Sequence, residues 1–256
     1  MNATGSTFRG AGLGHPPTLA TLDVVSVTVE GPNEGETRWT IMVNEDRTGI
    51  ELAEALASAV IQCDDRDGGT IQLWIREVDP IADGAAGDLG FRQHRDLWQL
   101  RCALPNVESG LRTRPFTESD IEAFVGVNNR AFHWHPEQSG LTPEQVRETM
   151  AEPWFNADGF RLLHDDNDEL IGFCWTKVHA DTSPPLGEIY VIAVDPSQHG
   201  MGLGKPMTLA GLEWLTDQGL KDGMLYVESD NDPANATYSR IGFTRHHTDR
   251  AYRLER

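Results

Sequence analysis

The sequence predicts an α/β fold with a mixed sheet, and three observations lead to this prediction. Residues 189–194 are mostly β-branched or aromatic, which is typical of a buried strand. After a break at Asp195 and Pro196 comes a loop with three glycines, and apolar residues of 203–215 then recur at helical spacing. Strand-like and helix-like segments alternate along the remaining chain, which is the order typical of α/β proteins.

The first part of the chain predicts a small unit of strands and helices. Residues 1–18 are rich in Gly, Thr and Pro and predict a loose segment, and 31–36 predict a turn between two strands. Alternating apolar residues indicate strands, and apolar residues at spacings of three and four indicate helices. The expected strands are 22–30, 38–43, 70–75 and 97–104, and the expected helices are 49–62 and 81–90.

Residues 105–110 predict a linker, so we expect one domain over 1–108 and a second over 109–256. In the second domain, Thr117 followed by Asp120 predicts the start of a helix that runs to about 132. Pro143 after Thr142 predicts another helix start. The other expected elements are strands 111–115, 160–164, 169–178, 189–194 and 224–228, helices from about 202 and over 231–241, and a β ribbon to 254.

The glycine loop predicts a cradle for a phosphate or pyrophosphate group. Glycine has no Cβ and lets the backbone approach a ligand. The free N–H groups and the dipole of the following helix then favour an anion. No Gly-Lys-Ser/Thr follows, so this is not a Walker loop, and the glycine spacing differs from the Rossmann fingerprint. By itself, a glycine turn without a ligand explains the loop equally well.

Composition excludes several classes of function. Lys and Arg number 21 against 40 Asp and Glu, a net charge of −19, which argues against nucleic-acid binding. Any anionic ligand is therefore held by local dipoles and a few cations such as Lys205. Cys63, Cys102 and Cys174 are widely spaced and imply a reducing, cytoplasmic location without a metal cluster. No apolar stretch approaches about 18 residues, so we expect no membrane partner. We also expect a monomer.

Two motifs resemble one acetyltransferase family. The loop His199-Gly200-Met201-Gly202-Leu203-Gly204 resembles the pyrophosphate loop of GNAT N-acetyltransferases, in which Arg or Gln stands at the place of His199. The segment from Asn231 to Phe243 is similar to the family's Asn-x-x-Ala-x-x-x-Tyr-x-x-x-Gly-Phe pattern and follows at the expected distance. The two motifs together are far more specific than either alone. This resemblance implies the GNAT acyl-CoA N-acyltransferase fold and acetyl-CoA as cosubstrate.

Further segments resemble the mycothiol synthase family of GNAT enzymes. That family carries two GNAT repeats, of which the C-terminal one is catalytic. The resemblance therefore implies that 109–256 is the catalytic domain and that 1–108 is a shortened, degenerate first repeat. The loop 44–49 of that repeat has one glycine and nearby carboxylates, so we expect it to hold no phosphate. The matching segments are 128–132, 135–138, 152–155, 172–179 and 225–231.

The resemblance also implies a reaction and its residues. Acetyl is transferred from acetyl-CoA to the cysteine amine of a cysteinyl-glucosaminyl-inositol, and the product is mycothiol. Glu188 matches the base that deprotonates the amine, directly or through water, and Tyr238 matches the acid for the CoA thiolate. Without the resemblance, Glu188 would be interpreted as a surface carboxylate. For Tyr238, a packing role in the core would be as good an interpretation as a catalytic one. Implied cofactor residues are Ile192, Ala193, Val194, His199, Gly200, Met201, Gly202, Leu203, Gly204, Lys205, Asn231, Asp232, Pro233, Ala234, Asn235 and Ala236. Implied substrate residues are Glu137, Lys177, Glu188 and Tyr226.

Two other functions stay open at this point. A GNAT enzyme could act on another amine, such as a peptide N-terminus or an aminoglycoside, and an acidic chain suits a cationic aminoglycoside. The first repeat, which lacks the early strands of a full GNAT repeat, and His199 also fit a CoA-binding protein without activity. His135 and His179 lack a second ligand at metal spacing, so we expect no metal.

Overall fold

The computed structural model describes residues 27–30, 38–43, 49–64, 69–133 and 140–255. These residues fall into two units: one is Gln99–His246, and the other combines the described residues before Gln99 with those after His246. Strands β4 (Arg92–Ala103) and β10 (Thr244–Glu255) contribute residues to both units. The predicted boundary between 108 and 109 separates two sequence repeats. A division of the chain by its contacts does not test such a boundary, so it stays a prediction.

The unit that contains the N-terminal elements has a mixed four-stranded arrangement in the order β1-β2-β3-β10. β1 and β2 are antiparallel, and β3 and β10 are antiparallel. β2 and β3 are parallel, and α1 connects them along the chain. The apolar faces of α1 and α2 join the strands in one core. The predicted 22–30 strand is found over 27–30, and its other residues lie outside the described part. The elements are β1 Val27–Glu30, β2 Arg38–Val43, α1 Gly49–Asp64, β3 Thr70–Ile75 and α2 Pro80–Asp88.

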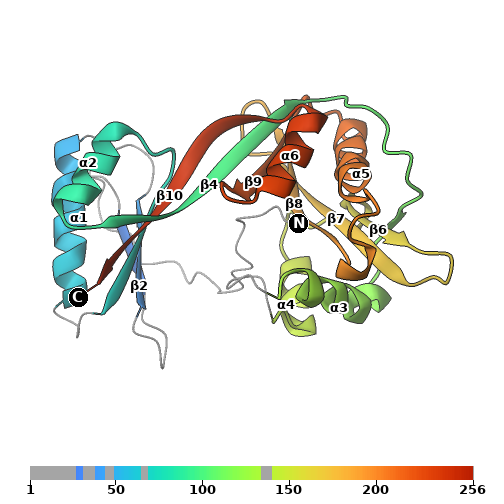
Figure 1. Cartoon of the computed structure of the whole chain (residues 1–256), viewed down its shortest axis with the longest axis horizontal. Helices are drawn as coiled ribbons and strands as arrows, with labels where there is room; N and C mark the ends of the chain where they lie inside the picture. Colours follow the sequence, from blue (N-terminus) through green and yellow to red (C-terminus); the bar gives the residue numbers. More distant parts are fainter. Residues whose placement is uncertain (1–26, 31–37, 44–48, 65–68, 134–139, 256) are drawn as a thin grey trace. The chain divides into compact units, whose positions relative to one another are not determined.

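The second unit has the strand order β4-β9-β8-β7-β6-β5 (Figure 1). Strands β5 to β8 pair antiparallel with their neighbours, and β8 and β9 are parallel, so the sheet is mixed. The elements are β5 Arg114–Pro115, α3 Ile121–Ala131, α4 Pro143–Met150, β6 Phe160–His164, β7 Leu170–His179, β8 Leu186–Val194, α5 Gly204–Asp217, β9 Asp222–Glu228 and α6 Asp232–Ile241.

Two strands differ from the prediction in length. β4 begins at Arg92, five residues before the predicted start. β5 has two residues, although 111–115 was predicted, because the Arg161 side chain takes the place of a ladder bond. Its Nη2 donates to the Thr113 carbonyl oxygen at 2.8 Å and its Nε to Thr113 Oγ1 at 3.1 Å.

The two predicted helix starts before α3 and α4 are confirmed. The Asp120 carboxylate accepts the Thr117 N–H at 2.8 Å, which fixes the turn that leads into α3. Arg114 Nη2 donates to Asp120 Oδ1 at 2.6 Å, and Arg114 Nη1 donates to Oδ2 at 2.8 Å. These bonds hold the pKa of Asp120 well below its usual value. At α4, Thr142 Oγ1 accepts the Gln145 N–H, and the Gln145 side chain accepts the Thr142 N–H.

The central strands carry different helices on their two faces. A Cβ on Gly187 would lie 2.8 Å from Leu215, and one on Gly211 would lie 2.7 Å from Ile189 Cδ1, so α5 covers one face at very close approach. On the other face, Phe124 of α3 packs against Phe160 and Phe173 with ring centroids 4.9 and 4.7 Å apart. The close approach of α5 brings its N-terminus to the end of β8.

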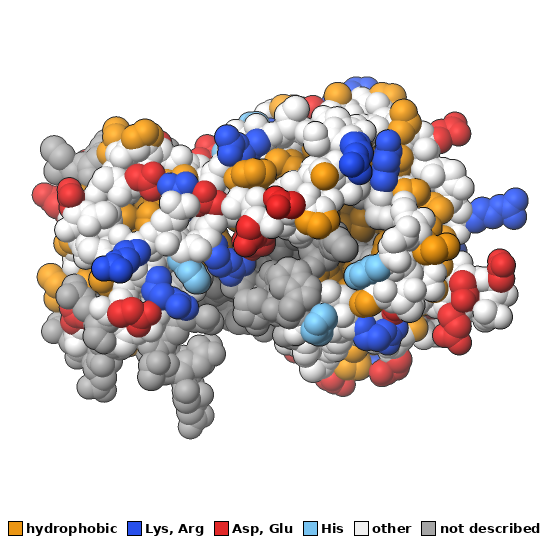
Figure 2. All heavy atoms as spheres, in the orientation of Figure 1, with side chains coloured by type: hydrophobic (Ala, Val, Ile, Leu, Met, Phe, Trp, Pro, Cys, Tyr) orange, Lys and Arg blue, Asp and Glu red, His pale blue; other side chains and the backbone are white. Residues whose placement is uncertain are grey.

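The described surface mixes charges of both signs. Figure 2 shows Asp and Glu side chains interspersed with Lys and Arg on the visible face. Among the described residues, no helix is long and apolar enough to cross a membrane.

We expect Gly211→Ala to lower stability. The added Cβ would overlap Cys174 Sγ and Ile189 Cδ1, and overpacking costs roughly 1–3 kcal/mol, of which the helix propensity of alanine offsets about 1 kcal/mol. Gly87→Ala in α2 is the matched control, because nothing lies within 4 Å of its Cβ. The free energy of unfolding in urea measures both. Equal or higher stability of Gly211→Ala relative to wild type would contradict this packing.

Candidate active site

The site begins where two parallel strands stop pairing. The ladder between β8 and β9 joins Gly187 to Gly223 and Glu188 to Met224. Both strands continue, but they form no further ladder pairs although all their residues are described. The β9-facing edge of the second half of β8 therefore keeps backbone groups that a bound molecule can pair with.

A β-bulge in β8 lies next to this opening. Trp175 of β7 pairs with Val191, and the next residue, Thr176, pairs with Ile189, which leaves Tyr190 as the extra residue on β8. A bulge bends its strand and re-aims the side chains beyond it. It separates the first half of β8, which carries Glu188, from the second half, which lines a cavity.

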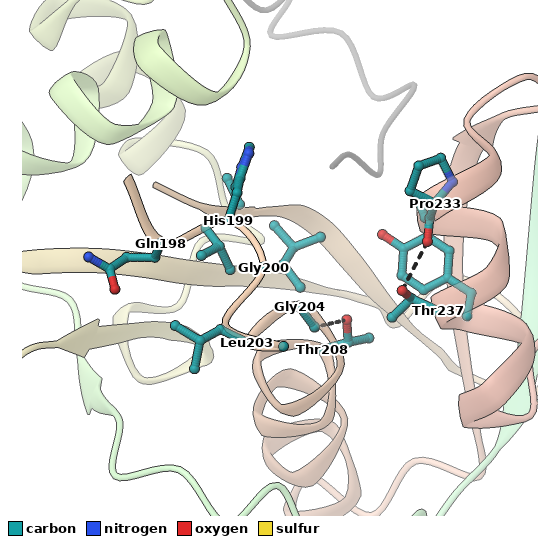
Figure 3. A pocket seen from close by; sticks show the side chains of 14 residues that line it. Gln198, His199, Gly200, Leu203, Gly204, Thr208, Pro233 and Thr237 are labelled. Carbon is teal, nitrogen blue, oxygen red and sulfur yellow. Dashed lines mark hydrogen bonds between the residues drawn. The ribbon is translucent and has the colours of Figure 1, made fainter. Parts of the chain in front are cut away.

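That cavity has a volume of about 270 Å³. One wall comes from the end of β8 and the glycine loop, and the other comes from α6. Figure 3 shows His199, Gly200, Leu203 and Gly204 on the loop side, with Pro233 and Thr237 opposite on the α6 helix. The lining residues are Ile192, Ala193, Val194, Gln198, His199, Gly200, Gly202, Leu203, Gly204, Thr208, Pro233, Ala234, Thr237 and Tyr238.

The glycine loop presents backbone donors to the cavity. Gly200 and Gly202 have φ of +86° and +73°, which side chains rarely adopt, and nothing lies within 4 Å of a Cβ built on either. The N–H groups of Gly200, Gly202 and Gly204 donate to no other described residue. α5 begins at Gly204 without a side-chain cap, so its positive end is exposed to the loop. This arrangement fits a phosphate-bearing ligand.

Asp195 anchors the start of the loop. Its Oδ1 accepts the Ser197 N–H at 2.9 Å, and its Oδ2 accepts Arg130 Nε and Nη2 at 2.9 and 2.6 Å. Burial opposes ionisation, but these donors outweigh it, and the pKa of Asp195 lies below its usual value. The sequence indicated a break at Asp195 and gave no sign of Arg130 as its partner.

The wall from α6 is fixed by its own caps. Asn231 Oδ1 accepts the Ala234 N–H at 3.3 Å, and Asn235 Nδ2 donates to the carbonyl oxygens of Glu228 and Ser229 at 3.2 Å each. Thr237 Oγ1 donates to the Pro233 carbonyl at 2.9 Å. The asparagines of this motif therefore hold the end of β9 and the start of α6 together.

Tyr238 of α6 also lines the cavity. It is 2% exposed, and its ring meets that of Phe243 edge-on with centroids 5.7 Å apart. Burial raises the pKa of Tyr238, so its hydroxyl keeps its proton at neutral pH.

Glu188 is 3% exposed and sits at the last ladder pair between β8 and β9. His179 Nε2 lies 2.7 Å from its Oε2. Because Glu188 is buried, the expectation that it is a surface carboxylate, made from the residue alone, is wrong. Glu188 does not line the cavity and lies earlier on the same strand.

Three of the predicted substrate residues share one face of the sheet. Lys177 pairs with Glu188, and Glu188 pairs with Met224, so these side chains point to the same side, as does Tyr226 two residues further along β9. Lys177 Nζ lies 4.6 Å from the ring centroid of Trp154, and Tyr226 OH accepts Gln99 Nε2 at 2.8 Å. The fourth, Glu137, lies outside the described residues.

The predicted cofactor residues divide into two groups. Ten of them line the cavity, and the others do not. Met201 is 70% exposed, and Lys205 Nζ lies 3.5 Å from the Arg240 carbonyl oxygen. The remaining non-lining residues are Asn231, Asp232, Asn235 and Ala236.

Sequence reasoning missed Gln198, Thr208 and Thr237. Thr208 lies one helical turn after Gly204, and Thr237 lies one turn after Pro233, so helical spacing from the motif glycine and proline could have indicated them.

Comparison with known proteins identifies the family. The model of the Acetyltransferase (GNAT) family matches residues 127–243. A mycothiol acetyltransferase from Actinosynnema mirum is 46% identical over 80% of this chain and 69% of its own length. Another from Segniliparus rotundus is 43% identical over 83% of both chains. The chain belongs to the mycothiol acetyltransferase family. A third relative, from Nocardia farcinica, is 42% identical over 72% of this chain and 64% of its own length.

Solved structures agree on the fold of this mycothiol acetyltransferase family member. A GCN5-related N-acetyltransferase from Sphaerobacter thermophilus has a TM-score of 0.71 at 18% identity, over 90% of this chain and 76% of that one. A tandem GNAT protein from the clavulanic acid biosynthesis pathway has a TM-score of 0.64 at 18% identity, over 91% and 79%. The predicted GNAT fold with a mixed α/β sheet is confirmed, and the chain is an acetyl-transferring enzyme. GNAT acetyltransferases generally use acetyl-CoA.

We expect Gly202→Asp to abolish acetyl-CoA binding while the protein stays folded. A side chain at this position, with a negative charge, would occupy the space beside the unpaired loop N–H groups. Gly219→Asp is a matched control, because Gly219 also has a positive φ of +80° and open space at its Cβ but lies outside the cavity lining. Calorimetry measures both, and unchanged affinity in Gly202→Asp would overturn the assignment of the loop.

Proposed function

We propose that this chain transfers acetyl from acetyl-CoA to the cysteine amine of desacetylmycothiol, a cysteinyl-glucosaminyl-inositol, to give mycothiol. The observation that carries the proposal is the opening of β8 from β9 beside the glycine loop, with Glu188 at the last ladder pair before the opening and Tyr238 in the lining of the cavity. The family relationship supports the choice of acceptor.

The cosubstrate is held mainly by backbone groups. The N–H groups of Gly200, Gly202 and Gly204 and the start of α5 bind its pyrophosphate, and the unpaired edge of Ile192 to Val194 binds the pantetheine arm. His199 lines the cavity where the family motif has Arg or Gln, and it supplies a ring N–H to the phosphates. These contacts suit an anion in a chain whose net charge is −19.

Glu188 is the proposed base. The acceptor amine is protonated at neutral pH and must lose a proton before its nitrogen can form a bond with the acetyl carbon. The carboxylate of Glu188 takes that proton, directly or through water. Its burial keeps competing water away from the charge, which strengthens its interaction with the ammonium.

Tyr238 is the proposed acid. When the carbon–sulfur bond of the thioester breaks, the electron pair stays on sulfur and the thiolate takes a proton from the Tyr238 hydroxyl. The nitrogen now bonded to the acetyl carbon loses its extra proton, which restores the tyrosine. Tyr238 lines the cavity and burial raises its pKa, so the hydroxyl arrives at this step protonated. Lys177, Tyr226 and Glu137 bind the sugar and inositol hydroxyls or the cysteine group on the Glu188 side.

We also propose that the enzyme is a cytoplasmic monomer without a metal. Cys102 and Cys174 are buried thiols, and burial raises the pKa of Cys102 to about 12, so the thiol is unreactive. Among the described residues, no group of three or more His, Cys, Asp or Glu could hold a metal ion.

The acceptor is tested by turnover with a panel of amines. We expect acetylation of desacetylmycothiol with a kcat/KM at least about 10²-fold above that for peptide N-termini and aminoglycosides, a ratio within reach of a site that hydrogen-bonds its substrate. Preference for an aminoglycoside or a peptide would replace the proposed acceptor. Binding of acetyl-CoA without turnover of any amine would instead indicate a non-catalytic CoA-binding protein.

We expect Glu188→Gln and Tyr238→Phe to respond differently to pH. Glu188→Gln should keep acetyl-CoA affinity and lose turnover by ~10²-fold or more, and high pH should partly restore it because more free amine is then present. Tyr238→Phe removes the donor to the thiolate, so high pH should not restore turnover.

The pH dependence of kcat for both variants measures this difference. Glu169→Gln, on the exposed β6–β7 hairpin, is the matched control for the carboxylate change and should behave as wild type. Wild-type turnover in Glu188→Gln, or one shared pH response in both variants, would show that the two roles are wrongly assigned.

A further inference from the structure

His179 is the described side chain that hydrogen-bonds the carboxylate of Glu188. Its Nε2 lies 2.7 Å from Glu188 Oε2, and among the described residues no second hydrogen bond to this carboxylate is formed. The His179 side chain is 23% exposed and that of Glu188 is 4% exposed, so the imidazole lies between a buried carboxylate and solvent.

The fold fixes this contact from both sides. His179 is the last residue of β7 and pairs with Leu186, two residues before Glu188 on β8, so both side chains point to the same face. Beyond β7, the single O–H of Thr182 is shared between the carbonyl oxygens of His179 and Pro184, which lie 2.9 and 3.0 Å from Oγ1. The turn that holds the histidine is therefore itself hydrogen-bonded.

The neighbouring cation does not compete for the carboxylate. Lys177 is paired with Glu188 across the ladder, but its Nζ lies over the rings of Trp154 and Tyr190, 4.6 and 5.7 Å from their centroids. No ion pair joins Lys177 to Glu188 in the described structure. The imidazole is thus the polar group that sets the direction of this carboxylate.

We propose that His179 is a positioning residue for Glu188: its Nε2–H donates to Oε2 and holds Oε1 toward the ammonium of the acceptor. The inference rests on the proposed function, because it assigns Glu188 as the base. A carboxylate oxygen bound to an N–H donor is less able to take the proton, so the bond selects which oxygen receives it. Fixing a base in its working orientation raises kcat without changing how the donor substrate binds.

Kinetics of two substitutions test the positioning role. His179→Leu removes the donor and should lower kcat by roughly 10-fold or more while the KM for acetyl-CoA is unchanged. His179→Gln places an amide N–H near the position of Nε2 and should keep kcat within about threefold of wild type. His246→Gln, at an exposed position of β10, is the control for the same chemical change.

A double variant separates positioning from general damage. If His179 acts through Glu188, then His179→Leu should cause no further loss in a Glu188→Gln background, because residues that act as a unit are non-additive. A merely structural effect would lower kcat by the same factor in both backgrounds. Additive losses, or equal losses in His179→Gln and His179→Leu, would overturn the proposal.

Nitrogen NMR of the imidazole gives a readout that does not need turnover. With the ring neutral, His179 should carry its proton on Nε2 and leave Nδ1 bare, since only that tautomer can donate to the carboxylate. A proton on Nδ1 alone would overturn the pairing whatever the acceptor is. Absence of desacetylmycothiol turnover in wild type, together with the Nε2–H tautomer, would refute the proposed acceptor and leave the His179–Glu188 pair standing.

Discussion

The candidate active site depends on the point at which one parallel ladder ends. β8 and β9 are joined at Gly187 and Glu188 and then form no further ladder pairs. A sheet that stayed paired would satisfy the backbone of 189–194 internally and would leave no room for a ligand between the strands. Because the pairing stops, a strand edge, a cavity and a helix N-terminus lie together at the C-terminal end of β8. Local backbone dipoles, rather than the negative net charge, then provide the attraction for an anion.

Much of this arrangement is local in sequence and could be predicted. Glycines with positive φ at 200 and 202 and the caps at Thr117 and Thr142 act within a few residues, so pattern reasoning finds them. The short β5 could not be predicted, because the Thr113 carbonyl oxygen accepts a hydrogen bond from the side chain of Arg161, which belongs to a strand about 50 residues further along the chain. The early start of β4 likewise depends on neighbours in the sheet rather than on its own residues.

The contacts that orient the side chains and loops of the site could not be predicted from the sequence. The bulge at Tyr190 is a matter of register between β7 and β8, and no residue type marks it. Asp195, just after β8, accepts hydrogen bonds from Arg130 of α3, 65 positions earlier in the chain. The motif residue Asn231 caps α6, and Asn235 joins α6 to the end of β9, roles that a match to a pattern does not reveal.

Three buried carboxylates of this unit have different partners, and the difference bears on the proposal that Glu188 is the base. Asp120 and Asp195 each have an arginine, and the bonds they accept lower their pKa, which makes them stable anions and poor proton acceptors. These two fix a helix start and a loop. Glu188 is equally buried but has an imidazole partner on one oxygen and no guanidinium among the described residues. An imidazole N–H donor can orient one carboxylate oxygen and leave the other open to a ligand. Arginine partners thus accompany Asp120 and Asp195, and a histidine partner accompanies Glu188, the carboxylate proposed as the base.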